Sequence, residues 1–83
     1  MSSIYEPSYR IFATCIKDYR LRAKMTQEAL ALQLGCAQSY VSKYEQGQKR
    51  LDIVEIRNIC KILGVSLSEF VSEYEFRLKK AGL

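Results

Sequence analysis

Hydrophobic residues recur along this chain at spacings of three and four, which is the repeat of an amphipathic helix. The first series begins near Tyr9 and ends near Ala23. It follows a lead-in of residues 1–8, which we expect to be flexible and to end at Pro7 and Ser8. The members of the series would share one helical face: Phe12, Cys15, Ile16, Tyr19 and Ala23. This stripe predicts a first helix over the same range, with its apolar face in a core.

The stretch from Thr26 to Gly47 contains two shorter helical patterns separated by a glycine. Thr26 is a good N-cap for a helix over about residues 27–34. Gly35 should end that helix, because glycine adopts the left-handed conformation at little cost. A third helix is expected over about residues 38–45. Two short helices joined by a tight glycine turn are typical of a helix-turn-helix motif.

Two further helices are predicted, and each is preceded by the pattern of a capping box. The two patterns are Asp52 with Glu55, before a helix over about 53–63, and Ser66 with Glu69, before a helix over about 67–80. The fourth helix has this apolar set: Val54, Ile56, Ile59, Cys60 and Leu63. The fold class is therefore predicted to be all-α, a compact five-helix domain over residues 9–83.

The last helix carries an apolar stripe that extends over about four turns. The stripe contains Leu67, Phe70, Val71, Tyr74, Leu78 and Ala81. We expect its first half to close the core and its second half to have little left to cover within one subunit. Tyr74, Leu78 and the off-stripe Phe76 are therefore expected to meet a partner chain at a dimer interface. The alternative is an exposed or frayed tail.

Length and composition fit one small domain of mildly basic character. The chain has 83 residues, of which 48% are hydrophobic, so its core is small and oligomerisation would help its stability. The net charge is +4 and the pI about 9.1, which is compatible with nucleic-acid binding but does not require it. The excess positive charge comes from one segment, in which Asp18 is outnumbered by basic residues: Arg10, Lys17, Arg20, Arg22 and Lys24. Charge alone leaves two interpretations open, a solvated face and a helix lying near phosphates.

The composition argues against several other classes of protein. The three cysteines, at 15, 36 and 60, are widely spaced and odd in number, and there is no histidine. We therefore expect reduced cysteines in the core, no disulfide framework, no metal site and no cofactor. No pairing of acid, base or nucleophile predicts catalytic residues, so the chain is not expected to be an enzyme. No apolar run is long enough to span a bilayer and no signal peptide is recognisable, which favours a cytoplasmic protein.

Polar side chains gather on the third helix. Those expected to point outward are Gln38, Ser39, Ser42 and Lys43. Val41 and Tyr44, three residues apart, would face the core instead. A small polar helix surface of this kind can enter the major groove of DNA. In the following loop, Lys49 and Arg50 could reach the phosphate backbone, whereas Tyr40 could either cover the helix edge or touch DNA.

The whole pattern resembles the XRE group of lambda-repressor-like (Cro/CI-type) helix-turn-helix proteins, which regulate transcription in bacteria and phages. The resemblance extends over about Phe12 to Val71. Its most specific blocks are Met25-Thr26-Gln27 with Leu30 and Ala31, then Leu34-Gly35, then Ser39 to Gly47, then Leu63-Gly64-Val65-Ser66. The resemblance implies a five-helix fold in which the second and third helices form the motif, with double-stranded DNA as the partner.

The resemblance also implies roles for matching residues. Gln27, at the start of the second helix, would bond a DNA phosphate, and Lys49 and Arg50 would bind phosphates at the edge of the contact. The residues that would read base edges are Gln38, Ser39, Ser42 and Lys43. Arg20 and Glu45 match a structural ion pair that ties the first helix to the third.

Two positions depart from the family pattern. Ala37 stands where relatives often have a serine or threonine cap, which could cost about 1 kcal/mol. Ser39 is short, so we expect sequence selectivity to rest partly on DNA shape.

The leading hypothesis is a sequence-specific DNA-binding regulator, a repressor or autoregulator. It would bind a palindromic operator as a homodimer, with the two third helices about 34 Å apart. The alternative is a helix-turn-helix protein-interaction module, such as an antitoxin or accessory factor, with weak or no specific DNA binding. The main partner-binding site of such a module would be the aromatic end of the last helix.

Overall fold

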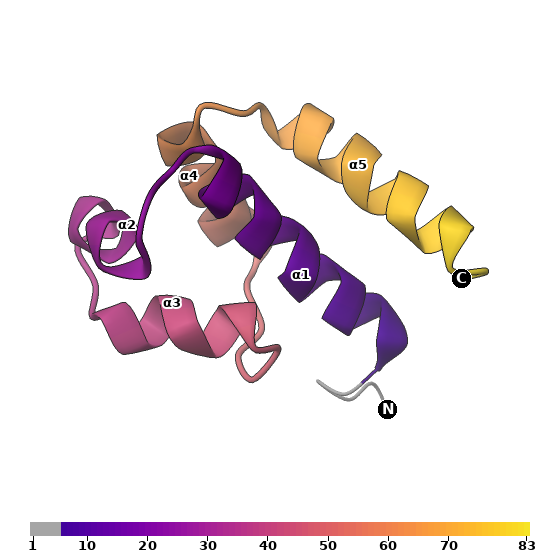
Figure 1. The fold of residues 1–83 in the computed structure, drawn as a ribbon, viewed down its shortest axis with the longest axis horizontal. Helices are drawn as coiled ribbons and strands as arrows, with labels where there is room; N and C mark the ends of the chain where they lie inside the picture. The colour runs from indigo at the N-terminus through magenta and orange to yellow at the C-terminus, as the bar shows by residue number, and fades with distance from the viewer. Residues whose placement is uncertain (1–5) are drawn as a thin grey trace.

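The computed structural model describes residues 6–83 and contains five α-helices (Figure 1). Their bounds are α1 Pro7–Arg22, α2 Gln27–Leu34, α3 Gln38–Glu45, α4 Ile53–Leu63 and α5 Leu67–Lys80. The predicted all-α fold class is confirmed, and the last four helices have the predicted bounds. The first helix begins at Pro7, two residues earlier than predicted, because proline is well suited to the first turn of a helix. Residues 1–5 of the predicted flexible lead-in lie outside the described residues.

The helix starts differ in how their free backbone N–H groups are satisfied. Thr26 Oγ1 accepts a hydrogen bond from the Ala29 amide at 3.0 Å, as its N-cap role requires. Asp52 and Glu55 form the complete capping box, with both hydrogen bonds at 2.8 Å. Ser66 caps α5 by accepting from the backbone of the residue three positions later. Ala37 offers no side-chain acceptor to α3, as predicted.

The core is built around the middle of α1 and the inner sides of the other helices. Its buried cluster comprises Phe12, Cys15, Ile16, Tyr19, Leu30, Ala31, Val41, Tyr44, Ile59, Cys60, Val65 and Phe70. The stripe predicted for α1 is thus buried, apart from the partly buried Ala23. Two cysteines are core residues as expected, and burial raises the pKa of the Cys60 thiol to about 11. The Cys36 thiol is only partly buried.

Two apolar residues assigned to inner faces are exposed instead. Val54 has 63% of its surface exposed, although it was expected to belong to the apolar face of α4. The buried face of that helix is centred on Ile59 and Cys60, and Val54 lies five residues before Ile59. At about 100° per residue, five residues place Val54 about 140° around the helix from Ile59. Val71, which was assigned to the half of the α5 stripe that closes the core, is 40% exposed.

The helix α1 lies between α3 and α5, and α5 runs alongside it to the far end of the molecule (Figure 1). The second half of α5 therefore has a surface to cover within its own chain. Tyr74 donates a hydrogen bond to the Ser8 carbonyl at 3.0 Å and its ring lies edge-on to Phe12. Arg77 on the same helix donates to Asp18 of α1 at 2.8 Å.

The expectation that this half of α5 has little to cover within one subunit is consequently wrong for Tyr74. The extra length of α1 at Pro7 and Ser8 supplies the surface that Tyr74 meets. Leu78 is partly buried, whereas Phe76 keeps 56% of its surface exposed. Only Phe76, of the three residues proposed for a partner, is left mainly to solvent.

Candidate nucleic-acid interface

The two sides of α3 differ sharply in exposure. Val41 and Tyr44 are fully buried against the core and hold the helix in place. Gln38, Ser39 and Lys43 are exposed on the side away from the core. The fourth residue assigned to base reading is Ser42, which is partly buried and accepts a hydrogen bond from Gln46 Nε2 at 3.0 Å. The structure therefore brings the four predicted readers onto one short helix and leaves three of them exposed.

A buried ion pair fixes α3 against α1. Arg20 Nε and Nη2 donate to the two carboxylate oxygens of Glu45 at 2.7 and 2.9 Å. A third donor, Arg20 Nη1, bonds the Met25 carbonyl at 2.8 Å. Arg20 is 6% exposed and Glu45 8% exposed, and their hydrogen bonding raises the pKa of the arginine. The pair implied by the family resemblance is present, in the planar two-bond geometry that arginine favours with carboxylates.

The ion pair continues outward as a chain of hydrogen bonds to the surface. Gln27 Nε2 donates to Glu45 Oε1 at 2.9 Å, and Gln38 Nε2 donates to Gln27 Oε1 at 2.6 Å. The first residues of α2 and α3 are thereby joined, and Gln38 is oriented from the buried Arg20 outward. We call this chain of four side chains the polar relay: Arg20, Glu45, Gln27 and Gln38.

The polar relay leaves Gln38 able to recognise a base. A glutamine amide has one carbonyl oxygen and two N–H donors, and the hydrogen bond to Gln27 uses one of the donors. The oxygen and the second N–H are the pair that adenine requires in the major groove. From sequence, Gln27 and Gln38 were assigned separate roles, on a phosphate and on a base. Their mutual hydrogen bond was missed, since no local pattern joins residues on opposite sides of a turn.

The loop after α3 holds its two predicted phosphate-binding cations over aromatic rings. The Lys49 ammonium lies 5.3 Å from the Tyr40 ring centre, and the Arg50 guanidinium lies 4.8 Å from the Tyr9 ring centre. The Tyr9 hydroxyl also donates to the Lys49 carbonyl. Such contacts restrict where the cations sit without neutralising them.

Tyr40 covers the edge between α3 and α4 and does not join the exposed readers. It is partly buried, and its hydroxyl donates to Glu55 Oε2 at 2.8 Å. Glu55 also accepts from the Asp52 amide, and these two hydrogen bonds hold the pKa of the Glu55 carboxyl below its ordinary value of 4.5. Of the two roles left open for Tyr40, the geometry favours the structural one.

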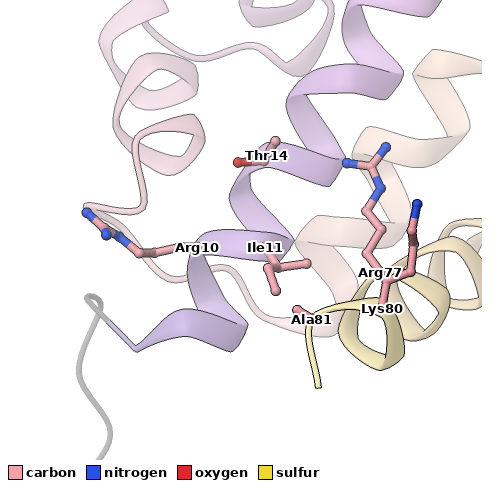
Figure 2. Close-up of a pocket in the computed structure, with 6 residues that line it drawn as sticks. All are labelled: Arg10, Ile11, Thr14, Arg77, Lys80 and Ala81. Atoms are coloured by element: carbon pink, nitrogen blue, oxygen red, sulfur yellow. The ribbon is translucent and has the colours of Figure 1, made fainter. Parts of the chain in front are cut away.

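A surface groove lies between α1 and α5 (Figure 2). It has a volume of about 440 Å³ and is lined by Arg10, Ile11, Thr14, Arg77, Lys80 and Ala81. Figure 2 shows the Arg10 guanidinium turned away from Ile11, so the groove is floored mainly by apolar and aliphatic atoms. Within residues 6–83, no three potential metal ligands cluster, and no helix is both long enough and apolar enough to cross a bilayer.

Comparison with known proteins identifies the same elements. The helix-turn-helix family model matches residues 16–70, which include all of the polar relay. The control protein C.MunI of Mycoplasma sp is 32% identical over 54 residues, which make up 65% of this chain and 73% of that protein. The cryptic phage CTXphi transcriptional repressor RstR of Vibrio cholerae is 28% identical over 65 residues, covering 78% of this chain and 59% of RstR.

A solved structure shares the fold over most of the chain. An XRE-family like protein from Pseudomonas syringae pv. tomato str. DC3000 superposes with a TM-score of 0.79 at 32% sequence identity. The superposition covers 89% of this chain and 90% of that one. With this match, the family model and the geometry of α2 and α3, the chain belongs to the XRE family of helix-turn-helix DNA-binding transcriptional regulators.

Proposed function

We propose that this protein is a sequence-specific regulator, acting as a repressor or autoregulator, that binds a palindromic operator as a homodimer. The observation that carries the proposal is the exposed Gln38 amide, held by hydrogen bonds to Gln27 and through it to a buried ion pair. A side chain that is already held in one place can discriminate between bases, because it loses little conformational entropy on binding. The names of RstR, a repressor, and C.MunI, a control protein, favour the same reading.

In this proposal α3 enters the major groove with its first turn toward the base edges. Gln38 bonds an adenine through its oxygen and remaining N–H, while Ser39 and Lys43 contact neighbouring positions. Ser42 contributes less than the others because it is partly buried and bonded to Gln46. The short Ser39 leaves part of the selectivity to DNA shape.

Phosphate contacts fix the register of α3 on the duplex. Gln27 lies in the first turn of α2, where backbone N–H groups and the helix dipole favour an anion. Lys49 and Arg50 bind phosphates at the edge of the contact from the loop that follows α3. Affinity should consequently fall steeply as salt concentration rises. The protein would act in the cytoplasm, where the DNA is.

The experiment is selection of binding sites from random duplex DNA, followed by comparison of Gln38→Ala with the native protein on the selected site. We expect a palindrome, and a loss of roughly 1–3 kcal/mol in binding free energy for the variant, with relaxed preference at one base pair. Gln33→Ala is the matched control, because Gln33 is also an exposed glutamine but lies near the C-terminal end of α2, outside the polar relay. Unchanged affinity and preference in Gln38→Ala would show that Gln38 does not read a base.

A second candidate function is a protein-interaction module with weak or no specific DNA binding. The exposed Phe76 ring on α5 is the observation that favours it. The same selection experiment separates the two functions. Folded protein that enriches no DNA sequence, and whose DNA affinity does not depend on sequence, would favour the interaction module.

A further inference from the structure

The order of donors and acceptors along the polar relay is set at its buried end. A carboxylate offers only acceptors, so the Gln27 amide must turn an N–H group toward Glu45. The Gln27 oxygen then faces Gln38, and Gln38 must in turn donate one of its N–H groups to that oxygen. Arg20 holds the carboxylate with two hydrogen bonds, so one ion pair fixes the direction of both amides. Gln38 is therefore left with its oxygen and one N–H group for a ligand.

This fixed direction distinguishes the two purines by their major-groove edges. Adenine offers an acceptor at N7 and a donor at its N6 amino group, which match one N–H group and one oxygen. Guanine offers two acceptors, N7 and O6, and a free glutamine can satisfy both with its two N–H groups. One N–H group of Gln38 is already donated to Gln27, so its oxygen would face O6 of a guanine. The polar relay thus makes recognition by Gln38 depend on a hydrogen-bond donor of the base.

The donor that adenine presents in the major groove is a single hydrogen atom. Its amino group carries two hydrogens, and one of them pairs with the O4 of thymine inside the duplex. The other projects into the major groove beside N7, where the Gln38 oxygen would accept it. A methyl group on N6 has to replace this outer hydrogen, because the inner one is needed for pairing. Methylation therefore removes the donor and places a methyl group beside N7, which the remaining N–H group of Gln38 would bond.

We propose that the protein binds its operator tightly only when the adenine opposite Gln38 is unmethylated at N6, so that adenine methylation of the operator releases it. The inference rests on the proposed function and adds a chemical state of the DNA that regulates it. Loss of one bidentate contact lowers affinity roughly 5- to 150-fold. The exposed Ala37 beside Gln38 could contact the added methyl group, but burial of one such group returns only about fourfold.

The test uses synthetic duplexes of the operator that the native protein selects from unmethylated random DNA. Selection with Gln38→Ala identifies the base pair whose preference depends on Gln38. N6-methyladenine is placed at that pair in one half-site, in both half-sites, or at an adenine outside the operator. Fluorescence anisotropy at one fixed salt concentration gives the dissociation constants. We expect affinity to fall at least about fivefold for one methyl group and about 25-fold for two, because separate positions contribute additively to the free energy.

Two variants and the outside methyl group serve as controls. Gln38→Ala has no amide to lose, so its dissociation constants for methylated and unmethylated operator should agree within about twofold. Gln33→Ala keeps the polar relay, so it should respond to methylation as the native protein does. The methyl group outside the operator should change the affinity of the native protein by less than about twofold. Circular dichroism verifies that both variants are folded.

Several outcomes would overturn the inference while sequence-specific binding stands. The native protein would bind the methylated and unmethylated operators equally well, or Gln38→Ala would lose as much affinity on methylation as the native protein does. A selected operator without adenine at the pair that depends on Gln38 would have the same consequence. A native protein that selects no DNA sequence would instead contradict the proposed function itself, and the inference would fall with it.

Discussion

The two ends of α1 are attached to the rest of the molecule by different kinds of contact. At its C-terminal end, Arg20 joins α3 through directional hydrogen bonds to a buried carboxylate. Nearer its N-terminal end, Phe12 meets α5 through aromatic rings, with centroids 5.7 Å from Phe70 and 6.0 Å from Tyr74. The first contact lies beside the candidate DNA-binding surface, and the second lies under α5.

The difference shows what each kind of contact can determine. Hydrogen bonds of an arginine fork hold two side chains in one geometry, which a site for base recognition needs. Their formation requires desolvating charges, so they contribute more to position than to net stability. Aromatic contacts bury area and tolerate small shifts of the rings, so they stabilise α5 on α1 without specifying every atom. The first three of the four predictions below test this division of roles.

The largest expected effect on stability comes from breaking the ion pair between Arg20 and Glu45. Glu45→Ala leaves the Arg20 guanidinium buried without its carboxylate, and breaking a buried ion pair in this way costs about 3–5 kcal/mol. For a domain of this size, a loss of that order is a large part of the total free energy of unfolding. Urea denaturation followed by circular dichroism measures it. A loss below about 1 kcal/mol would mean that the ion pair does not anchor α3.

A double variant separates stability from position. Arg20→Met with Glu45→Leu replaces both charges by apolar side chains, and such replacements are often neutral or stabilising. We expect stability near the native value but weaker selectivity for the chosen DNA site, because Gln27 loses the Glu45 oxygen that orients it. If the double variant is stable and selects DNA as well as the native protein does, the role assigned to the polar relay is wrong.

A smaller effect on stability is expected from weakening the aromatic contact between α1 and α5. Phe12→Leu keeps an apolar residue but removes edge contacts with Phe70 and Tyr74, which together with lost area should cost about 1–3 kcal/mol. The DNA sequence selected by the folded protein should stay the same, since α3 is held from the other end of α1. Urea denaturation and binding-site selection on the same variant measure both quantities. A changed DNA preference would show that the two ends of α1 are coupled.

The smallest effect concerns the start of α3. Ala37 has the extended backbone of an N-cap residue, φ −75° and ψ 150°, but lacks a side-chain oxygen. Ala37→Ser should supply that acceptor and stabilise the protein by about 1 kcal/mol. Thr26→Ala is the reciprocal control, because it removes the hydrogen bond that caps α2 and should cost a similar amount. An unchanged midpoint in Ala37→Ser would indicate that water already caps α3.

Local signals in the sequence were sufficient for the helices themselves. The caps at Thr26, Asp52 and Ser66 act within three residues along the chain, and each begins its helix where predicted. Gly35 and Gly64 end their helices at φ 73° and 76°, a conformation that glycine adopts without steric cost. The family resemblance added the Arg20–Glu45 pair, which no local rule predicts.

The sequence by itself determined five helices, their order, the residues of the motif and the buried stripe of α1, because those depend on spacing and on contacts between near neighbours. Only the tertiary structure decided which way Val54 and Tyr74 face, since burial depends on which helix lies opposite. It also joined Gln27 to Gln38, because a hydrogen bond between two helix starts requires the turn that brings them together. A one-dimensional pattern carries neither the direction of a neighbour nor the distance between side chains on separate helices.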